Sequence, residues 1–454
     1  MRVLWLCNFM LPAVAQHLGQ KGTNKEGWIS GMAEVILKRC QDNDIQLGIA
    51  FPVPVQMDGY REILPIYGEN LTCYGFYEDT LHAENYDPAL EEKMQGILQD
   101  FKPDVIHCYG TEYPHTLAMC RACQDKQKIL ISIQGLCSVY ANTYFADLPE
   151  KVVESATFRD LLKKDSLQEQ KRKYEKRGKN EIEAIKLAGN IAGRTEWDHF
   201  YASEWNPKAR YYHLNETLRS CFYNMRWEKE KAYPHTIFLS QGNYPIKGLH
   251  YMLLALPDIL KKYPDTQIYV AGDSIICDRT WKDKIKISSY GRYLRDLIKK
   301  LKLTGHVEFL GSLTAEQMRD RYLSSSLFVC PSTIENSPNS LGEAMLLGMP
   351  CISADVGGVR SIFTAGKDGI LYPGYVTTKN AFDRKYLGAE QRKNAKTALA
   401  DNAKALADAV NSMWDETDKQ QFFCENAANH AERNHNREEN YRRMLEIYAD
   451  IKNA

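Results

Sequence analysis

Short apolar runs and longer stretches with helical spacing alternate along the sequence from its start. Runs of strand length occupy residues 3–7, 45–51, 103–109, 129–133, 236–240, 267–271, 307–310, 327–330 and 351–354. Helical spacing marks residues 32–40, 290–303, 315–324, 395–414 and 425–451. Strands that alternate with helices are typical of parallel sheets, so we predict an α/β protein. We interpret 3–7 as the first strand and not as a signal peptide, because Asn8 and Pro12 interrupt the apolar run.

The pattern is clearest over residues 327–358. Pro331 breaks the apolar strand, and a polar turn then leads to a helix that begins near Ser340. A glycine and a proline end this helix, and a second strand leads to a pair of glycines. Both loops lie at the carboxyl ends of strands, where open α/β sheets bind their ligands. Glu335 lies in the first loop and Glu343 on the helix behind it, with seven residues between them.

This segment resembles the donor site of the retaining glycosyltransferases of family 4, which have the GT-B fold. Members of that family carry two glutamates at this spacing, then small residues, a Gly-Pro stop and a glycine pair. The resemblance implies that Glu335 contacts the donor sugar and that Glu343 contacts the ribose of a sugar nucleotide. A carboxylate can accept hydrogen bonds from two neighbouring hydroxyls, and a helix N-terminus favours phosphate, which agrees with these roles. Further donor contacts are implied for Ser337, Asn339, Ser340, Gly357 and Gly358.

A loop after the strand at 236–240, with the sequence QGNYPIKG, extends the resemblance. Lys247 stands where the family carries a lysine that holds the donor diphosphate, and Gly242 lies in the same loop. Asn243 takes the approximate place of the family's arginine, so one cationic contact is missing. A lysine at a helix start opposes the helix dipole unless an anion is bound, which favours the phosphate role. Gly27 falls in the glycine-bearing stretch after the first strand, which lies beside the donor phosphates in the family; a surface turn is the alternative.

Polar residues after the strands at 103–109 and 129–133 are candidates for the acceptor side of the site. They are Thr111, Glu112, His115 and Gln134. Family members often carry histidine where Gln134 stands, so the role of that histidine does not transfer. For His115 the alternative interpretation is helix capping or packing. His107 lies inside a strand and is interpreted as a buried structural residue.

Residues 190–198 and 211–218 are interpreted as the last two units of the first domain, and Arg194 follows the predicted strand of the first of them. It is a candidate for contact with phosphate or acceptor, and an Arg194–Asp198 surface pair is the alternative.

We predict two Rossmann-like, doubly wound domains in the GT-B arrangement that the resemblance implies. The first, at 1–230, would bind the acceptor, and the second, at 231–425, would bind the sugar nucleotide. Residues 426–454 are predicted to form a helix that returns to the first domain. The linker is placed at 225–234.

Residues 158–186 form a helical stretch that is dense in lysine and arginine. One interpretation is a solvated helical hairpin with one face on the core. The other is a peripheral membrane contact, since basic amphipathic helices bind anionic lipid.

Composition narrows the classes of function. Lys+Arg and Asp+Glu both number 58, and this balance argues against broad nucleic-acid binding. Many of the 12 cysteines lie in apolar segments, as is typical of a reducing compartment, so we expect a cytoplasmic protein that is peripheral on the membrane at most. No apolar stretch has the length of a membrane span. No cluster has metal-ligand spacing, so we expect neither a metal nor another cofactor.

The sequence therefore predicts a metal-independent, retaining glycosyltransferase. It would move a hexose-type sugar from a nucleotide-sugar donor to a saccharide or lipid-linked acceptor, in cell-surface polysaccharide or glycoconjugate synthesis. Glu335 and Lys247 are the predicted catalytic residues. Two alternatives stay open: a nucleotide-sugar 2-epimerase of similar fold, and a non-catalytic subunit that binds sugar nucleotide.

Overall fold

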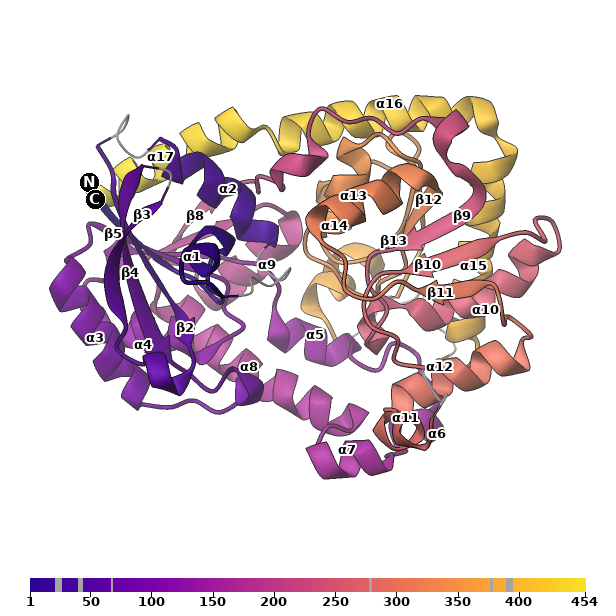
Figure 1. Cartoon of the computed structure of the whole chain (residues 1–454), viewed down its shortest axis with the longest axis horizontal. Coiled ribbons are helices and arrows are strands. Elements are labelled where there is room, and N and C mark those ends of the chain that lie inside the picture. Colours follow the sequence, from indigo (N-terminus) through magenta and orange to yellow (C-terminus); the bar gives the residue numbers. More distant parts are fainter. Residues whose placement is uncertain (21–26, 40–43, 67, 277–279, 376–378, 389–394) are drawn as a thin grey trace. The chain divides into compact units, whose positions relative to one another are not determined.

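The computed structural model describes residues 1–20, 27–39, 44–66, 68–276, 280–375, 379–388 and 395–454. Figure 1 shows the chain as two units, each built around its own sheet. Unit 1 contains Met1–Val139, Lys173–Ser220 and Asn434–Ala454, and unit 2 contains Tyr140–Arg172 and Cys221–Arg433. The chain passes between the units four times. Two crossings lie within the helices α5 (Cys137–Thr143) and α8 (Leu167–Leu187), and the others lie between Ser220 and Cys221 and between Arg433 and Asn434.

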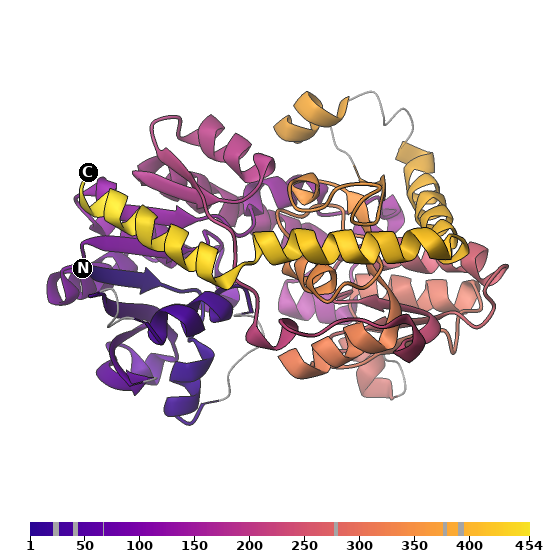
Figure 2. The same ribbon diagram turned by 90° about the horizontal axis from the view of Figure 1, so that it is seen from above.

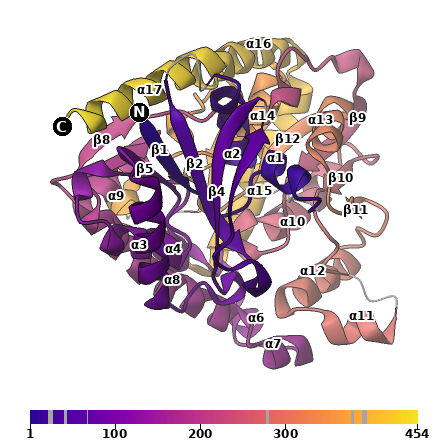
Figure 3. The same ribbon diagram turned by 60° about the vertical axis from the view of Figure 1, so that its left-hand side comes forward.

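The sheet of unit 1 has eight strands in the order β3-β4-β2-β1-β5-β6-β7-β8. Every neighbouring pair is parallel except β3 and β4. Figure 3 shows β4, β2, β1 and β5 beside one another. The strands are β1 (Arg2–Leu6), β2 (Gln46–Val53), β3 (Arg61–Ile66), β4 (Glu69–Tyr77), β5 (Val105–Tyr109), β6 (Ile129–Ser132), β7 (Asn190–Gly193) and β8 (Arg210–His213).

Alternating side chains of the first strand supply two separate core layers, one on each face of the sheet. Val3 and Trp5 pack into one layer, and Leu4 and Leu6 pack into the other. The helices that belong wholly to unit 1 are α1 (Pro12–His17), α2 (Gly27–Leu37), α3 (Ala89–Phe101), α4 (Pro114–Ala122), α9 (Glu196–Trp205) and α17 (Arg437–Lys452).

The C-terminal helix α17 belongs to unit 1, whereas residues 426–433, which the sequence analysis grouped with it, belong to unit 2. The hydroxyl of Tyr448 accepts a hydrogen bond from Trp5 Nε1 at 2.9 Å and lies 2.7 Å from Nδ1 of His107. His107 is fully buried, which confirms its structural interpretation. Burial lowers the pKa of His107 to about 3, so the ring is neutral.

The single helical segment predicted at 425–451 is instead two helices, α16 (Thr417–Asn434) and α17, which Figure 2 shows in succession. The reason is local: Asn436 caps α17 by accepting from the backbone N–H of Glu439 at 3.0 Å. The basic segment at 158–186 is likewise divided, into α7 (Phe158–Lys163) and α8.

The sheet of unit 2 has six parallel strands in the order β11-β10-β9-β12-β13-β14. The α/β class and the two parallel-sheet units predicted from the sequence are therefore confirmed. The strands are β9 (Tyr233–Leu239), β10 (Gln267–Val270), β11 (Val307–Phe309), β12 (Ser325–Cys330), β13 (Cys351–Asp355) and β14 (Ile370–Pro373).

The remaining helices belong to unit 2. They are α6 (Glu150–Val153), α7, α10 (Leu249–Leu260), α11 (Trp281–Lys286), α12 (Ser289–Lys300), α13 (Ala315–Ser324), α14 (Asn339–Leu346), α15 (Ala395–Asp415) and α16. Within the described parts of the chain, no helix combines the length and the apolar character needed to cross a bilayer.

Candidate active site

Each sheet reverses its strand order at one point, and polar side chains gather after the strands at that point. In unit 2 the reversal lies between β9 and β12, which are parallel neighbours. In unit 1 it lies between β1 and β5. The carboxyl ends of strands at such a reversal form the usual ligand site of open α/β sheets.

Lys247 and Glu335 meet at the reversal in unit 2. Lys247 ends the short 3₁₀ turn Pro245–Lys247 after β9, and Glu335 lies in the loop after β12. Their Nζ and Oε1 atoms are 2.6 Å apart, and Glu335 is buried. Burial alone would lower the pKa of Lys247, but the Glu335 carboxylate outweighs it and holds this pKa well above its usual range.

Two backbone contacts bring these loops together. Gly248 has a φ of +73°, and a Cβ on it would lie 1.9 Å from the carbonyl oxygen of Pro331. The N–H of Thr333 donates to the carbonyl of Ile246 at 2.8 Å. Only glycine permits both this conformation and this approach, so the Lys-Gly pair is a structural requirement of the site.

The glycine pair after β13, Gly357 and Gly358, contacts the backbone carbonyl of Glu335. The N–H of Gly358 donates to the carbonyl oxygen of Glu335 at 2.9 Å. A Cβ on Gly357, whose φ is +52°, would lie 2.1 Å from that same oxygen. The Gly358 amide, which the sequence analysis assigned to a donor contact, thus holds the glutamate loop in place in this structure.

The N-terminus of α14 lies directly after the Glu335 loop. It has no side-chain cap and no acidic residue in its first turn. Ser337 is buried, Asn339 and Ser340 are partly exposed, and the buried Oδ1 of Asn339 has no hydrogen-bond partner. Free backbone N–H groups and a positive helix end favour an anion at this position.

Glu343 lies on the same helix and is buried. Its Oε2 is 3.4 Å from the hydroxyl of Tyr322, a fully buried residue of α13. Tyr322 also donates to the carbonyl of Ser340 at 3.0 Å, which ties α13 to the first turn of α14. Tyr322 belongs to the site, but no motif in the sequence marks it.

For the other predicted donor residues the structure gives a position and a degree of burial. Gly242 is buried, and a Cβ there would lie 2.8 Å from the side chain of Leu249. Asn243 is exposed in the same loop. Gly27 begins α2 in unit 1, and most of the glycine-bearing stretch before it lies outside the described residues.

At the reversal in unit 1, His115 is fully buried between two polar partners. Its Nδ1 lies 2.7 Å from Oε2 of Glu78, and its Nε2 lies 3.0 Å from Oδ1 of Asn8. Asn8 in turn donates to Glu112 at 3.2 Å, so four side chains form one network. A cavity of about 400 Å³ adjoins the network, with Asn8, Glu78, Phe9 and other residues in its wall.

Thr111 contributes to a second buried group. It donates to Oε2 of Glu181 at 3.1 Å, and that carboxylate also accepts from the backbone N–H groups of Cys137 and Ser138. Glu181 therefore caps the N-terminus of α5. Burial raises the pKa of Glu181 to about 7, although the hydrogen bonds from Ser138 and Cys137 act in the opposite direction.

Arg194 is buried, so the predicted surface pair with Asp198 is wrong. Its guanidinium lies 3.1 Å from Oε1 of Glu216 and donates to Oε1 of Gln134 at 3.3 Å. The Asp198 carboxylate accepts from the backbone N–H of Arg194, at 3.0 Å, and caps α9 by accepting from the backbone N–H of Thr195. The candidates Arg194 and Gln134 are thus brought together by the fold.

Sequence reasoning missed several residues that complete these groups. They are Asn8, Glu78, Glu181 and Tyr322. Asn8 follows the first strand directly, so its position at a strand end could have marked it. Glu78 follows β4, a strand that the apolar pattern did not predict, and Glu181 lies in the basic helix. In the described part of the chain, no group of three or more His, Cys, Asp or Glu side chains could hold a metal ion.

Residues 224–406 match the model of the family described as glycosyl transferases group 1. A D-inositol 3-phosphate glycosyltransferase of Rhodococcus erythropolis is 34% identical over 126 residues, which are 27% of either chain. In the first three curated relatives the matched segments cover 35%, 37% and 41% of the relative's length.

Several solved structures match over nearly the whole chain. A sucrose-phosphate synthase from Thermosynechococcus elongatus has a TM-score of 0.68 at 14% identity, covering 99% of both chains. The Anabaena protein HepE in complex with UDP-glucose has a TM-score of 0.62 at 14% identity, covering 99% of this chain and 100% of that one.

Proposed function

Residues 224–406 form a glycosyl transferases group 1 domain within a chain of the GT-B fold, and from this premise we propose that the protein is a retaining glycosyltransferase. It would transfer a hexose-type sugar from a nucleotide-sugar donor to a saccharide or lipid-linked acceptor. The product would belong to a cell-surface polysaccharide or glycoconjugate. The cysteines that the structure describes are free and largely buried, which supports synthesis in the cytoplasm, where thiols stay reduced.

One observation carries the proposal: Lys247 and Glu335 are in contact at the strand reversal, beside the uncapped N-terminus of α14. This places a cation, a carboxylate and free backbone N–H groups in one site. A sugar diphosphate needs this combination, because its phosphates require positive charge and its hydroxyls require acceptors.

The diphosphate would bind to the Lys247 ammonium and to the N–H groups of Asn339 and Ser340. As the bond between the sugar and the phosphate breaks, negative charge grows on the leaving nucleoside diphosphate. Fixed positive charge stabilises this state more than the ground state. Asn243 is uncharged and cannot replace the second cation of the family pattern. The α14 N-terminus would therefore stabilise more of the negative charge on the leaving diphosphate.

Glu335 would accept hydrogen bonds from the sugar hydroxyls and orient the ring. Its backbone is fixed by Gly357 and Gly358, so the carboxylate is positioned before the donor arrives. Glu343 would accept from the ribose hydroxyls. A UDP-glucose complex of a structural neighbour supports a nucleotide sugar as the ligand class.

Transfer would occur on the face of the sugar that the phosphate leaves. The acceptor hydroxyl oxygen forms a bond to the anomeric carbon while the bond from that carbon to the phosphate oxygen breaks. The proton of the acceptor hydroxyl passes to the departing phosphate, which gives a nucleoside diphosphate and a product of retained configuration. No metal ion takes part in this scheme, because Lys247 and the helix N-terminus neutralise the phosphate.

Acceptor hydroxyls would bind to the polar network of unit 1. Asn8, Glu78 and Glu112 offer both donors and acceptors beside the cavity of about 400 Å³. His115, Thr111 and Arg194 are buried and Gln134 is part-buried, so we assign these residues to positioning the acceptor side.

The test has two stages. Thermal stabilisation by a panel of nucleotide sugars identifies the donor, and the purified protein is then incubated with that donor and candidate acceptors. We expect a new glycosidic product and free nucleoside diphosphate. A 2-epimerised sugar would identify an epimerase, and donor binding with no turnover would identify a non-catalytic subunit; either result would overturn the proposal.

A further inference from the structure

Helix α7 presents large apolar side chains to solvent. Phe158, Leu161 and Leu162 are 63%, 70% and 73% exposed. Helix α11 packs beside α7 in unit 2 and adds Ile285, which is 40% exposed. Single exposed apolar residues are ordinary, but several on adjoining helices are typical of an interaction site. We call these four side chains the apolar face.

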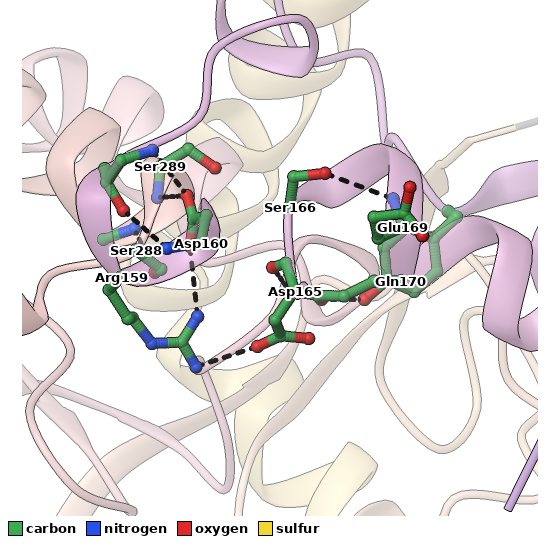
Figure 4. A network of polar contacts seen from close by, with 11 residues as sticks. Arg159, Asp160, Asp165, Ser166, Glu169, Gln170, Ser288 and Ser289 are labelled. Atoms are coloured by element: carbon green, nitrogen blue, oxygen red, sulfur yellow. Dashed lines mark hydrogen bonds and ion pairs between the residues drawn. The ribbon is translucent and has the colours of Figure 1, made fainter. Parts of the chain in front are cut away.

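The opposite side of α7 is fixed to unit 2 by a polar network, shown in Figure 4. Asp160 is buried and accepts from the backbone N–H of Ser289, the first residue of α12, at 2.9 Å. It also accepts from the N–H of Thr157 at 3.1 Å, which completes a capping box. Arg159 joins Asp160 to Asp165, at 3.1 Å and 2.9 Å. Because these contacts hold the polar side of α7 against unit 2, the apolar face of the helix points to solvent.

The charge beside the apolar face is positive. Lys163, Lys164 and Lys286 are exposed, and within the part of the chain that the structure describes none of them has a carboxylate partner. The nearby acidic groups serve the fold: Asp160 and Asp165 belong to the network of Figure 4. Asp283 caps its own helix α11 by accepting from the N–H of Thr280 at 2.9 Å.

We propose that α7 and α11 dock the protein on a bilayer that contains anionic phospholipid. The apolar face would enter the boundary between headgroups and acyl chains, and the lysines would lie at the lipid phosphates. A second copy of the chain fits less well, because it would bring like-charged lysines of two molecules together. The inference goes beyond the proposed function and does not depend on it, since binding needs neither donor nor acceptor.

The test uses the full chain and sedimentation with vesicles of phosphatidylcholine, with or without one third phosphatidylglycerol. We expect binding to the anionic vesicles that weakens as salt is added. The variant Phe158→Ser/Leu161→Ser/Leu162→Ser should partition at least about tenfold less, because it loses the apolar area that would be buried. Lys163→Gln/Lys164→Gln/Lys286→Gln should lose the preference for anionic lipid.

The matched control is Phe422→Ser. Phe422 is 50% exposed on α16 of the same unit, and its variant should bind as the wild type does. The single variant Leu162→Ser, which is the least demanding on folding, should bind measurably less than this control. Three results would overturn the inference: no binding to anionic vesicles, equal binding by the triple apolar variant, or an apolar-face variant that only turns a dimer into a monomer. None of them would affect sugar transfer to a water-soluble acceptor, so the two proposals fail separately.

Discussion

The Nζ atom of Lys247 lies 2.6 Å from Oε1 of Glu335, although the residues are 88 positions apart in the sequence. They meet because β9 and β12 are neighbours in the sheet and the loops that follow them leave at the same edge. The raised pKa of Lys247 keeps its ammonium charged throughout the neutral range, and the stabilising effect of this charge is lost only as the pH rises through that raised pKa. A donor diphosphate would therefore compete with Glu335 for a fully charged ammonium.

Lys247→Ala should lower turnover far more than it weakens donor binding. Removing one preorganised electrostatic contact costs on the order of 10²–10³ in rate. Steady-state kinetics on the identified donor measure this, with Lys261→Ala as the control, since Lys261 is an exposed lysine near the end of α10. Equal turnover by the two variants would mean that Lys247 has no part in the reaction.

Glu335→Gln should fold and bind nucleoside diphosphate, yet lose most of its turnover. The amide retains the size of the carboxylate, and the supporting contacts of Gly357 and Gly358 involve only the backbone of residue 335. Calorimetry of nucleotide binding and a transfer assay separate the two effects. Weakened nucleotide binding with normal turnover of bound donor would contradict the assigned role.

Glu343→Ala should weaken nucleotide binding, because the ribose hydroxyls would lose a buried acceptor. An unpaired buried polar group costs about 1–3 kcal/mol. Tyr322→Phe is the comparison: it removes a hydroxyl 3.4 Å from Glu343 and should have a smaller effect in the same direction. If both variants bind the nucleoside diphosphate as the wild type does, Glu343 does not contact ribose.

Glu181 predicts a pH dependence of stability in unit 1. Burial raises its pKa from the ordinary 4.5 to about 7, so the folded state holds a proton that the unfolded state releases. Stability from this group is therefore greatest below pH 4.5 and falls as the pH rises to 7, by up to about 3 kcal/mol at 1.36 kcal/mol per pH unit.

Thermal midpoints of the wild type and of Glu181→Gln across this pH range measure the effect. As the pH rises from 4.5 to 7, the thermal midpoint of the wild type should fall relative to that of Glu181→Gln. A difference that is constant over the range, or that shifts in favour of the wild type, would mean that the buried carboxylate is ionised throughout.

Much of the fold could be predicted because parallel strands buried on both faces are continuous apolar runs. β5 and β12 are examples, and their predicted bounds differ from the observed ones by about two residues. The pair β3 and β4 was missed, since β3 is an antiparallel edge strand whose first three residues are exposed. The assignment of 140–172 to unit 2 depends on contacts such as that of Asp160 with Ser289, which no periodicity reveals.

The candidate site was only partly accessible from the sequence. Lys247, Glu335 and Glu343 lie in recognisable spacing, and the fold brings the first two into contact. Tyr322 and Glu78 become neighbours of the site only through tertiary structure, one from α13 and one from the end of β4. Arg194 illustrates the opposite error, because a spacing typical of a helical surface pair belongs here to a buried residue.

The stereochemistry of transfer tests the central claim most directly. The anomeric signal of the product is followed by NMR from the first turnovers, with and without a strong chelator. We predict a product with the anomeric configuration of the donor, formed at the same rate in both samples, because Lys247 and the α14 N-terminus neutralise the phosphate. An inverted product, or activity that a chelator abolishes and magnesium restores, would contradict the retaining mechanism and the roles of Glu335 and Lys247.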